Sequence, residues 1–256
     1  MRAIKLFLLM ACLLACLLAG PAALAADSPA IDAAIRDADR SEKDRAADVR
    51  RRPRAVLAFF GVDEGMTVLD LYSGGGYYTE LVARTVGEDG VVVSHNNQAY
   101  LAFAKSDLAT RYADDRLPNV ERLLAENNEI ELDESRFDVV LMVLAYHDVY
   151  YVEESIGWPA IDGPALLAEI LGSLKPGGVL GVVDHVAVAG APAEVAQSLH
   201  RIDPARLRSD MEAAGFVFDG ESDVLRNAAD DHTIPMSGPT VRGKTDRVVY
   251  RFRRPE

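Results

Sequence analysis

The stretch Val68-Leu69-Asp70-Leu71-Tyr72-Ser73-Gly74-Gly75-Gly76 decides the fold. Residues 68–71 are apolar apart from one carboxylate and predict a buried strand, and the pattern of residues 77–86 predicts a helix directly after the glycines. Ligands in a doubly wound sheet bind beyond the C-terminal ends of the strands, where glycines let the backbone come close to them. The N-terminus of the following helix adds free N–H groups and a positive dipole end. We therefore predict a ligand-binding loop; a plain glycine-rich turn is the alternative.

Two familiar nucleotide-binding patterns do not match this loop. A nicotinamide fingerprint needs a third glycine or alanine where this chain has Thr79, and an acid after the second strand, which instead ends Ser94-His95-Asn96. A P-loop needs Gly-Lys-Ser or Gly-Lys-Thr, which does not follow the glycines. The pattern therefore predicts neither a nicotinamide dinucleotide nor a P-loop nucleotide as the ligand of this loop.

Outward from the loop, apolar runs alternate with amphipathic stretches. After the first strand we predict strands at 91–93, 120–124, 137–145, 179–183, 216–218 and 247–252, and helices at 53–60, 98–111, 164–174 and 204–214. Strands that alternate with helices predict a parallel α/β sheet with right-handed crossovers. The last two strands are separated by the irregular residues 220–246 and are predicted to form an antiparallel hairpin. Residues 247–252 alternate charged and apolar side chains, which indicates an edge-facing strand.

The N-terminus has the pattern of a secretory signal peptide. Arg2 and Lys5 precede the apolar run Leu6–Gly20, and Ala23-Leu24-Ala25 forms a small-x-small cleavage pattern. The run is short for a membrane span, which needs about 20 apolar residues. We therefore expect residues 1–25 to be removed and the protein to be exported, periplasmic or secreted, with no membrane span after cleavage. A lipoprotein anchored through Cys16 is the weaker alternative, since the bulky Leu14 lies in the segment Leu13-Leu14-Ala15 that precedes this cysteine.

We divide the chain after the leader into a helical or linker segment at 26–52 and one domain at 53–256.

The composition of the whole sequence limits which functions are expected. The 256 residues carry a formal net charge of −13 and 49% are apolar, which allows a packed core and argues against a nucleic-acid binder. The two Cys both lie in the leader, so no disulfide framework or Cys-rich zinc site is expected. The oligomeric state is left open.

Three motifs in order resemble class I S-adenosylmethionine-dependent methyltransferases. Val68-Leu69-Asp70 with Gly74-Gly75-Gly76 resembles the first motif of that family, Phe137-Asp138-Val139-Val140 the fourth-strand motif, and Leu174-Lys175-Pro176-Gly177-Gly178 the turn before the fifth strand. The chain is more closely similar to a bacterial group of exported predicted methyltransferases. That narrower match is carried by Tyr77-Tyr78-Thr79-Glu80, Val183-Asp184-His185, His200-Arg201-Ile202-Asp203 and Arg242-Gly243-Lys244-Thr245-Asp246.

The resemblance implies a Rossmann-like, doubly wound sheet of seven strands, mostly parallel, with a reversed last strand. It implies that Gly74, Gly75 and Gly76 hold the methionine part of S-adenosylmethionine and that Asp70 organises the loop. The chain departs from the family at two positions: Tyr72 replaces the usual first loop glycine, and Asn96 replaces the usual ribose-binding acid. Asn96 can still hydrogen-bond a hydroxyl, without the strength that a charge adds.

Three further residues are candidate cofactor contacts. Tyr77 begins the helix beside the loop and is predicted to cover the cofactor, with ordinary aromatic packing as the alternative. Glu126 and Asn127 follow the third strand and are predicted to meet an adenine amine, or else to form a turn.

Histidines and acids gather at the ends of the predicted strands. His95, His147 and His185 each follow a strand, Asp148 adjoins His147, and Asp184 adjoins His185. The alternative for any one of them is a helix cap or a loop hydrogen bond. Imidazole can act as a general base near neutral pH, and His/carboxylate clusters bind zinc or iron. We predict His147, Asp148 and His185 as catalytic, because the resemblance places the substrate near the end of the fourth strand.

Two functions follow from these patterns. The first is an S-adenosylmethionine-dependent methyltransferase that acts on a small-molecule acceptor. The second is a non-catalytic periplasmic protein that binds a small molecule or a metal on the same fold, which stays open because fold does not fix function.

Overall fold

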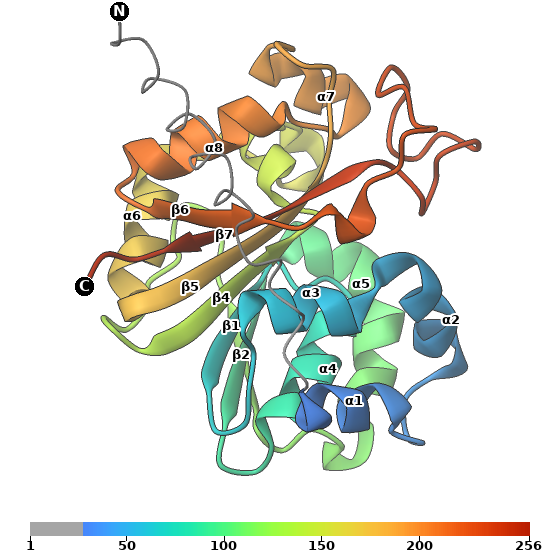
Figure 1. Ribbon diagram of the computed structural model, residues 1–256, viewed down its shortest axis with the longest axis vertical. Helices are drawn as coiled ribbons and strands as arrows, with labels where there is room; N and C mark the ends of the chain where they lie inside the picture. Colours follow the sequence, from blue (N-terminus) through green and yellow to red (C-terminus); the bar gives the residue numbers. More distant parts are fainter. Residues whose placement is uncertain (1–27) are drawn as a thin grey trace, which may run out of the picture.

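The fold is a seven-stranded sheet covered by helices on both faces (Figure 1). The computed structural model describes residues 28–256, so the predicted signal peptide lies outside the described residues. The sheet runs in the order β3-β2-β1-β4-β5-β7-β6. Its strands are β1 (Thr67–Leu71), β2 (Val91–Asn96), β3 (Val120–Leu124), β4 (Phe137–Val143), β5 (Leu174–His185), β6 (Val217–Glu221) and β7 (Arg247–Arg253). The helices are α1 (Pro29–Arg36), α2 (Glu42–Arg51), α3 (Pro53–Phe60), α4 (Tyr77–Val86), α5 (Gln98–Arg111), α6 (Gly163–Ser173), α7 (Ala196–Leu199) and α8 (Pro204–Ala213).

The predicted fold class is confirmed. Strands β1 to β5 pair in parallel, and β7 is antiparallel to both β5 and β6. The reversed last strand and the antiparallel pair at the C-terminal end are therefore both present. Four of the predicted elements have the predicted bounds without any change: α3, α4, α5 and β3. Their bounds follow signals that are local to the sequence.

The prediction that residues 247–252 form an edge strand is wrong. β7 lies between β5 and β6, so β6 forms that edge. Charged side chains of β7 have partners on other segments: Arg253 Nε lies 2.7 Å from Asp219 Oδ2, and Arg251 donates to the Phe59 carbonyl at 2.8 Å. Alternation reports which residues share a face and says nothing about how many neighbours a strand has.

β2 and β5 extend into residues that were predicted to flank them. β2 continues to Asn96, so His95 lies inside the strand and not beyond it. β5 begins at Leu174 and includes the predicted turn before it, and it continues to His185, so His185 also lies inside its strand. A turn-like feature does exist there, because the register against β4 shifts between Phe137 and Val139, and Gly177 has a φ of +72°.

The two faces of the sheet bury separate apolar clusters. One cluster joins the strands to α1, α3 and α4, and the other joins them to α6 and α8. Alternate residues of β4 divide between them, with Val139 and Leu141 on the first face and Val140 and Met142 on the second. Gly181 of β5 lets α3 approach closely, because a Cβ there would lie 2.6 Å from the ring of Phe60.

Residues 28–52 include two capped helices, α1 and α2. Ser28 and Ser41 accept hydrogen bonds from the first turns of α1 and α2, as N-caps commonly do. α1 packs on α4. Within residues 28–256, no helix has the length and apolar character needed to cross a membrane.

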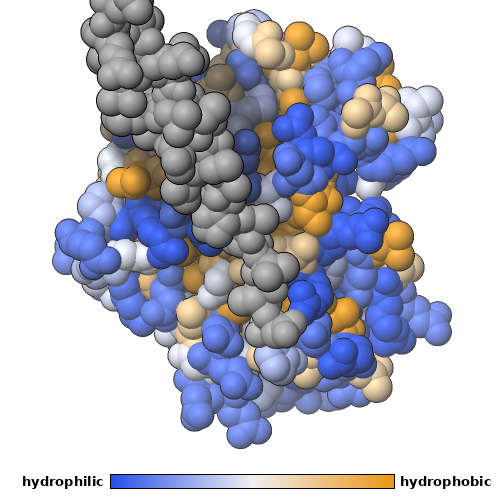
Figure 2. All heavy atoms as spheres, in the orientation of Figure 1, coloured by the Kyte–Doolittle hydropathy of each residue, from blue (hydrophilic) through white to orange (hydrophobic). Residues whose placement is uncertain are grey.

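The face of the molecule drawn in Figure 2 is mostly hydrophilic outside the grey atoms, with apolar side chains interspersed. The exposed large apolar residues come from separate elements: Val49, Phe103, Leu124, Val152, Ile156, Val188 and Val217. Single exposed apolar side chains are ordinary on protein surfaces and indicate no docking site.

Candidate functional site

The glycine loop between β1 and α4 has the backbone that its sequence demands. Gly74 and Gly76 have φ values of +56° and +75°, a region that favours glycine. A Cβ at Gly75 would lie 2.9 Å from Asp107, and one at Gly76 would lie 2.7 Å from Arg111 Cδ. The close approach that these glycines permit is therefore made, in this structure, by two side chains of α5.

Asp70 is buried beneath the loop at the end of β1. Its Oδ2 accepts a hydrogen bond from Thr79 Oγ1 at 2.6 Å, which ties β1 to the first turn of α4. Burial raises the pKa of Asp70 from 3.8 to about 6, because the hydrogen bonds from Thr79 and the distant charges of Arg51 and Arg111 offset only part of the lost hydration. The position predicted to organise the loop thus holds a carboxyl that resists ionisation.

Tyr72 has a left-handed backbone, with a φ of +56°, where the family has glycine. Its ring lies 5.1 Å from His95, 5.7 Å from Tyr100 and 6.0 Å from Trp158, measured between centroids. Its hydroxyl is buried and has no hydrogen-bond partner within residues 28–256. Burial raises the pKa of Tyr72 well above its ordinary value. Tyr72 therefore fills the space next to the loop and leaves one polar atom unsatisfied there.

The amides at the ends of β2 and β3 meet beside the loop. Asn96 Oδ1 accepts from the Gly74 N–H at 2.9 Å, and Asn96 Nδ2 donates to Ser73 Oγ at 2.9 Å. Asn127 Oδ1 accepts from Asn97 Nδ2 at 2.7 Å, while Asn127 Nδ2 is buried without a partner in the described part of the chain. Asn96 is thus engaged by the loop itself, and Asn127 offers a free donor.

The other two candidate cofactor contacts lie at the margin of this group. Glu126 Oε1 accepts from the Gln98 N–H at 3.3 Å, at the start of α5. Tyr77 donates to Asp48 Oδ1 at 2.6 Å, and the guanidinium of Arg51 lies 4.5 Å from its ring centroid. Tyr77 therefore joins α4 to α2.

A cavity of about 210 Å³ borders the glycine loop. Its walls come from the loop and α4 on one side and from α2 on the other, and they include Lys43, Asp44, Asp70, Tyr72, Gly74, Gly75, Tyr77 and Tyr100. A more open hollow of about 590 Å³ lies between α1 and α3, lined by Ile35, Arg52, Pro53 and others, away from the strand ends. We assign the site to the smaller cavity, because it is the one that the strand ends and the glycine loop border.

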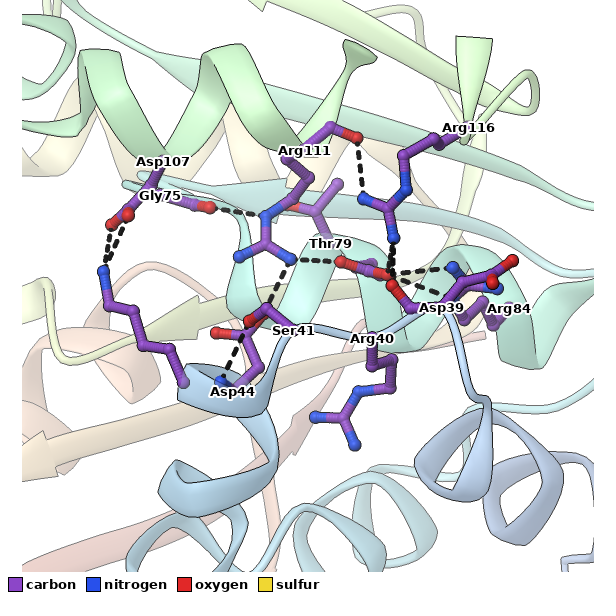
Figure 3. Close-up of polar contacts among 12 residues, drawn as sticks. Asp39, Arg40, Ser41, Asp44, Gly75, Thr79, Arg84, Asp107, Arg111 and Arg116 are labelled. Atoms are coloured by element: carbon purple, nitrogen blue, oxygen red, sulfur yellow. Dashed lines mark hydrogen bonds and ion pairs between the residues drawn. The ribbon is translucent and has the colours of Figure 1, made fainter. Parts of the chain in front are cut away.

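A buried ion-pair network fixes α2 over this cavity (Figure 3). Arg111 of α5 bonds the Gly75 carbonyl at 2.6 Å, Asp44 of α2 at 2.8 Å, and Glu80 of α4. Glu80, which is 1% exposed, also pairs with Arg84 and Arg116, each at 2.9 Å. In Figure 3, dashed lines join Arg111 to Gly75 of the loop and to Asp44.

A second group of side chains lies at the ends of β4 and β5. His147 is in the 3₁₀ turn Tyr146–Tyr150, and its Nδ1 lies 2.7 Å from Asp184 Oδ1 while its Nε2 lies 3.2 Å from Asp148 Oδ1. Burial alone would lower the pKa of His147, but the carboxylates of Asp184 and Asp148 outweigh burial and raise the pKa to about 9. Burial opposes ionisation of Asp148, yet His147, His200 and Tyr100 lower its pKa. At neutral pH this arrangement favours a protonated His147 between two carboxylates.

His185 and His200 complete the group. The rings of His147 and His185 lie 5.7 Å apart, and those of His147 and His200 lie 5.5 Å apart. Burial, followed by the charges of His147, Arg247 and Arg201, lowers the pKa of His185 well below 6.5, so that it is neutral. Its Nδ1 lies 2.6 Å from Thr245 Oγ1.

Tyr100 joins the two halves of the site. Its hydroxyl donates to Asp148 Oδ2 at 2.9 Å, and its ring would lie 3.8 Å from a Cβ at Gly74. Trp158 stacks beside it at 5.4 Å and donates to the Asp148 carbonyl at 3.0 Å. The glycine loop and the histidine group therefore belong to one continuous site.

Comparison with known proteins agrees with this geometry. The family model described as "Methyltransferase domain" matches residues 62–225, which contain strands β1 to β6, the glycine loop and the histidine group. The chain belongs to the methyltransferase domain family. A curated relative, the ubiquinone/menaquinone biosynthesis C-methyltransferase UbiE of Idiomarina loihiensis, is 32% identical over 126 residues. That match covers 49% of this chain and 45% of the relative, so the chain matches less than half the length of that protein.

Several solved structures share the fold. A SAM dependent methyltransferase from Aquifex aeolicus has a TM-score of 0.56 at 24% identity, over 82% of this chain and 96% of that chain. An S-adenosylmethionine dependent methyltransferase from Mesorhizobium loti has a TM-score of 0.55 at 16% identity, over 82% and 99%. The [4+2]-cyclase SpnF has a TM-score of 0.54 at 19% identity, over 86% and 85%. These likenesses establish the fold, and the cyclase shows that proteins with other names share it.

The methyltransferase domain brings together most of the side chains that the sequence singled out. Asp70, Tyr77 and Asn96 lie at the loop Gly74–Gly76, and Asn127 is bound to Asn97 next to them. His147, Asp148 and His185 form the second group with His200. His95 is apart from the histidine group and lies beside the loop instead: its Nδ1 accepts from the Tyr72 N–H at 3.4 Å and its Nε2 lies 3.1 Å from the Ala125 carbonyl. Burial lowers the pKa of His95 to about 4. The roles of these residues in binding and catalysis stay predictions.

Sequence reasoning missed four residues of the site. Asp44 and Arg111 looked like ordinary surface charges of amphipathic helices, and Tyr100 and Trp158 like ordinary aromatic residues. One signal pointed to Tyr100: it follows the helix cap Asn97 by three residues and is therefore held at the start of α5, next to the end of β2.

Proposed function

We propose that this chain is an S-adenosylmethionine-dependent methyltransferase that acts on a small-molecule acceptor. The observation that carries the proposal is the cavity between the glycine loop of a methyltransferase domain and α2, which reaches Tyr100 and the end of β4 at Val143 and Leu144. S-adenosylmethionine, when bound, supplies a methyl group on a positively charged sulfur.

The residues around the loop fit such a cofactor. Tyr72 Oη and Asn127 Nδ2 are buried polar atoms without partners among residues 28–256, and each leaves a hydrogen bond for a ligand to make. The proposed cofactor-binding residues are Asp70, Gly74, Gly75, Gly76, Tyr77, Asn96, Glu126 and Asn127. Both departures from the family pattern, Tyr72 and Asn96, lie in this set or touch it, so the binding mode differs in detail from the family pattern.

The proposal includes a movement of helix α2. Pockets for small molecules commonly have volumes of about 300–1,000 Å³, and the cavity of about 210 Å³ is smaller. We propose that α2 moves aside to admit the cofactor and returns over it. Lys43 pairs with Asp107 at 2.6 Å on the exposed side, Asp44 pairs with Arg111 on the buried side, and Asp48 accepts from Tyr77 at 2.6 Å. Of these contacts of α2, the exposed one is the weakest.

The histidine group handles the acceptor and its proton. Both ring nitrogens of His147 face carboxylates, Nδ1 at 2.7 Å from Asp184 and Nε2 at 3.2 Å from Asp148, so His147 positions Asp148 at the acceptor end of the site. The unprotonated members facing it are the carboxylate of Asp148 and the neutral imidazole of His185. One of these two takes up the proton that the acceptor loses, and methyl transfer then depends on the positioning of the acceptor.

The leader adds a second part to the proposal. Residues 1–25 have the charge, apolar run and cleavage pattern of a signal peptide, and we propose that they are removed on export to the periplasm or beyond. The measurement is the intact mass of the protein recovered from the periplasmic fraction. A mass that begins at Ala26 supports the proposal, a lipid-modified Cys16 favours the anchored alternative, and an intact Met1 contradicts export by cleavage.

Calorimetric titration with S-adenosylmethionine tests the enzyme proposal. Gly74→Ala places a methyl group at the loop, and Gly157→Ala is the matched control, because both glycines have positive φ and neither has a backbone atom within 4 Å of the new Cβ. We expect the purified protein to bind the cofactor, Gly74→Ala to weaken binding at least tenfold, and Gly157→Ala to bind like the wild type. No binding at about millimolar cofactor, which corresponds to less than about 4 kcal/mol, refutes the proposal.

The family match favours this proposal over the non-catalytic binder. The two differ in turnover: the binder takes up a small molecule without forming S-adenosylhomocysteine from S-adenosylmethionine.

A further inference from the structure

We propose that His147, Asp148 and His200 form a binding site for a divalent transition-metal ion of the zinc type. Each offers one donor atom, and the three atoms lie within 4.8 Å of one another. The inference deepens the proposed function, since His147 and Asp148 are the residues proposed above for the acceptor end, and a bound ion would replace the proton on His147 Nε2. None of the three residues belongs to the glycine loop, so a metal can bind there with or without S-adenosylmethionine.

The distances suit a tetrahedral ion. Zinc bonds to imidazole nitrogen and carboxylate oxygen are about 2.0–2.2 Å long, which places neighbouring donors of a tetrahedron roughly 3.4 Å apart. His147 Nε2 lies 3.2 Å from Asp148 Oδ1, and His200 Nδ1 lies 3.4 Å from the same oxygen. Two of the three edges therefore already have the length that a bound ion requires.

The outer contacts of the cluster orient its donors toward a common point. His147 Nδ1 lies 2.7 Å from Asp184 Oδ1, and the His147 N–H of the backbone donates to Asp184 Oδ2 at 2.7 Å. Metal-bound histidines commonly use their second nitrogen in this way, on a buried carboxylate that fixes the ring and raises its basicity. Asp184 is fully buried, so the ring of His147 is held with Nε2 facing Asp148.

Asp148 and His200 have supporting contacts of the same kind. Tyr100 donates to Asp148 Oδ2 at 2.9 Å, which leaves Oδ1 to face both imidazoles. His200 has a φ of +49°, a strained value for a residue with a side chain, and its ring stacks on Tyr151 with centroids 4.8 Å apart. Strain of this kind persists where the surroundings require a side chain to point one way.

Two imidazoles and one carboxylate are the donor set of catalytic zinc sites, which keep a fourth position for water or substrate. The side chain of His200 is 35% exposed and those of His147 and Asp148 are 2% and 13% exposed, so the open position lies on the solvent side. An ion there contacts an oxygen, nitrogen or sulfur atom of an acceptor and not the glycine loop.

Metal binding to the purified protein tests the proposal directly. After dialysis against a chelator, the protein is titrated with Zn²⁺ by calorimetry and with Co²⁺ by visible absorption, and bound metal is counted by elemental analysis. We expect one ion per chain and the intense visible bands of tetrahedral Co²⁺. These readouts need no cofactor and no acceptor, so failure of the metal site and failure of the methyltransferase proposal are distinguishable.

Three variants decide which residues bind the ion. His200→Ala removes a partly exposed donor that holds no part of the core, and it should lower Zn²⁺ affinity at least tenfold. Tyr100→Phe keeps all three donors and removes only the hydrogen bond to Asp148, for which a loss of about 10–100-fold is expected. His232→Ala is the control, since His232 also contacts an aspartate, Asp246 at 3.0 Å, but lies outside the cluster. Absence of a stoichiometric ion, or equal affinity in His200→Ala and the wild type, overturns the proposal.

Discussion

Replacement of Asp70 by Asn tests whether burial of this carboxyl lowers the free energy of unfolding at neutral pH. Asp70 is 2% exposed, and its pKa is raised from 3.8 to about 6 chiefly by lost hydration. A carboxyl whose pKa is higher in the folded than in the unfolded protein stabilises the fold at low pH, where it is protonated in both states. That stability is lost as the pH rises from about 4 to about 6, because the folded state must then ionise a buried group.

The size of the effect follows from the two pKa values. Their difference corresponds to about 3 kcal/mol, at about 1.4 kcal/mol for each tenfold change in proton affinity. The amide that Asp70→Asn introduces has no proton to lose, so the free energy of unfolding of this variant should rise by about 3 kcal/mol relative to the wild type between about pH 4 and about pH 7. The hydrogen bond from Thr79 can still be accepted by the amide oxygen.

Urea denaturation of both proteins across this pH range is the assay. The quantity compared is the difference in the free energy of unfolding between variant and wild type, so contributions of all other titrating groups cancel. Asp133→Asn is the control for the loss of one negative charge, because its side chain is 77% exposed. A difference for Asp70→Asn that stays constant with pH refutes the reasoning that burial dominates at this carboxyl.

Three further substitutions test the neighbouring contacts. Tyr72→Phe removes a buried hydroxyl without a partner in the described chain and should raise the free energy of unfolding by about 1 kcal/mol or more in urea denaturation, whereas a loss of stability would mean that the hydroxyl is satisfied. Glu80→Gln leaves Arg84, Arg111 and Arg116 facing an uncharged amide and should lower the free energy of unfolding by about 3–5 kcal/mol in the same assay; a loss under about 1 kcal/mol contradicts a buried network. Asp44→Asn releases α2 from Arg111 and should speed S-adenosylmethionine binding in stopped-flow measurements, and an unchanged association rate argues against α2 as a cover.

Much of the fold could be predicted because its determinants are local. α5 begins after the cap Asn97 and ends at Arg111 as expected, and β4 was visible as a run of apolar residues buried on both faces. The position of β7 was not predictable in this way, because Arg251 and Arg253 reach partners on Phe59 and Asp219 that lie far away in the sequence.

The site likewise has a part that could be predicted from the sequence and a part that depends on contacts between distant residues. Parallel strands place their C-terminal ends at one edge, so the proximity of His147 to Asp184 followed from strand order alone. The cover of α2 did not follow, since Asp44 and Arg111 are 67 positions apart and each belongs to a helix whose other charged residues are mostly solvated. Arg51 is a similar case: it belongs to α2, yet its guanidinium lies 4.5 Å from the ring centroid of Tyr77 in α4.

The division of the strand edge into two groups suggests where an acceptor meets the protein. The loop end, at β1 and β2, is enclosed by α2, Tyr72 and the ion pairs of Arg111, and its unsatisfied atoms are an amide and a hydroxyl. The other end, at β4 and β5, holds two carboxylates and three imidazoles, of which His200 reaches solvent. Tyr100 and Trp158 stand between them and contact both. We infer that a cofactor is enclosed at the first end while the acceptor enters at the second, because only the second combines solvent access with groups that can take up or hold a proton.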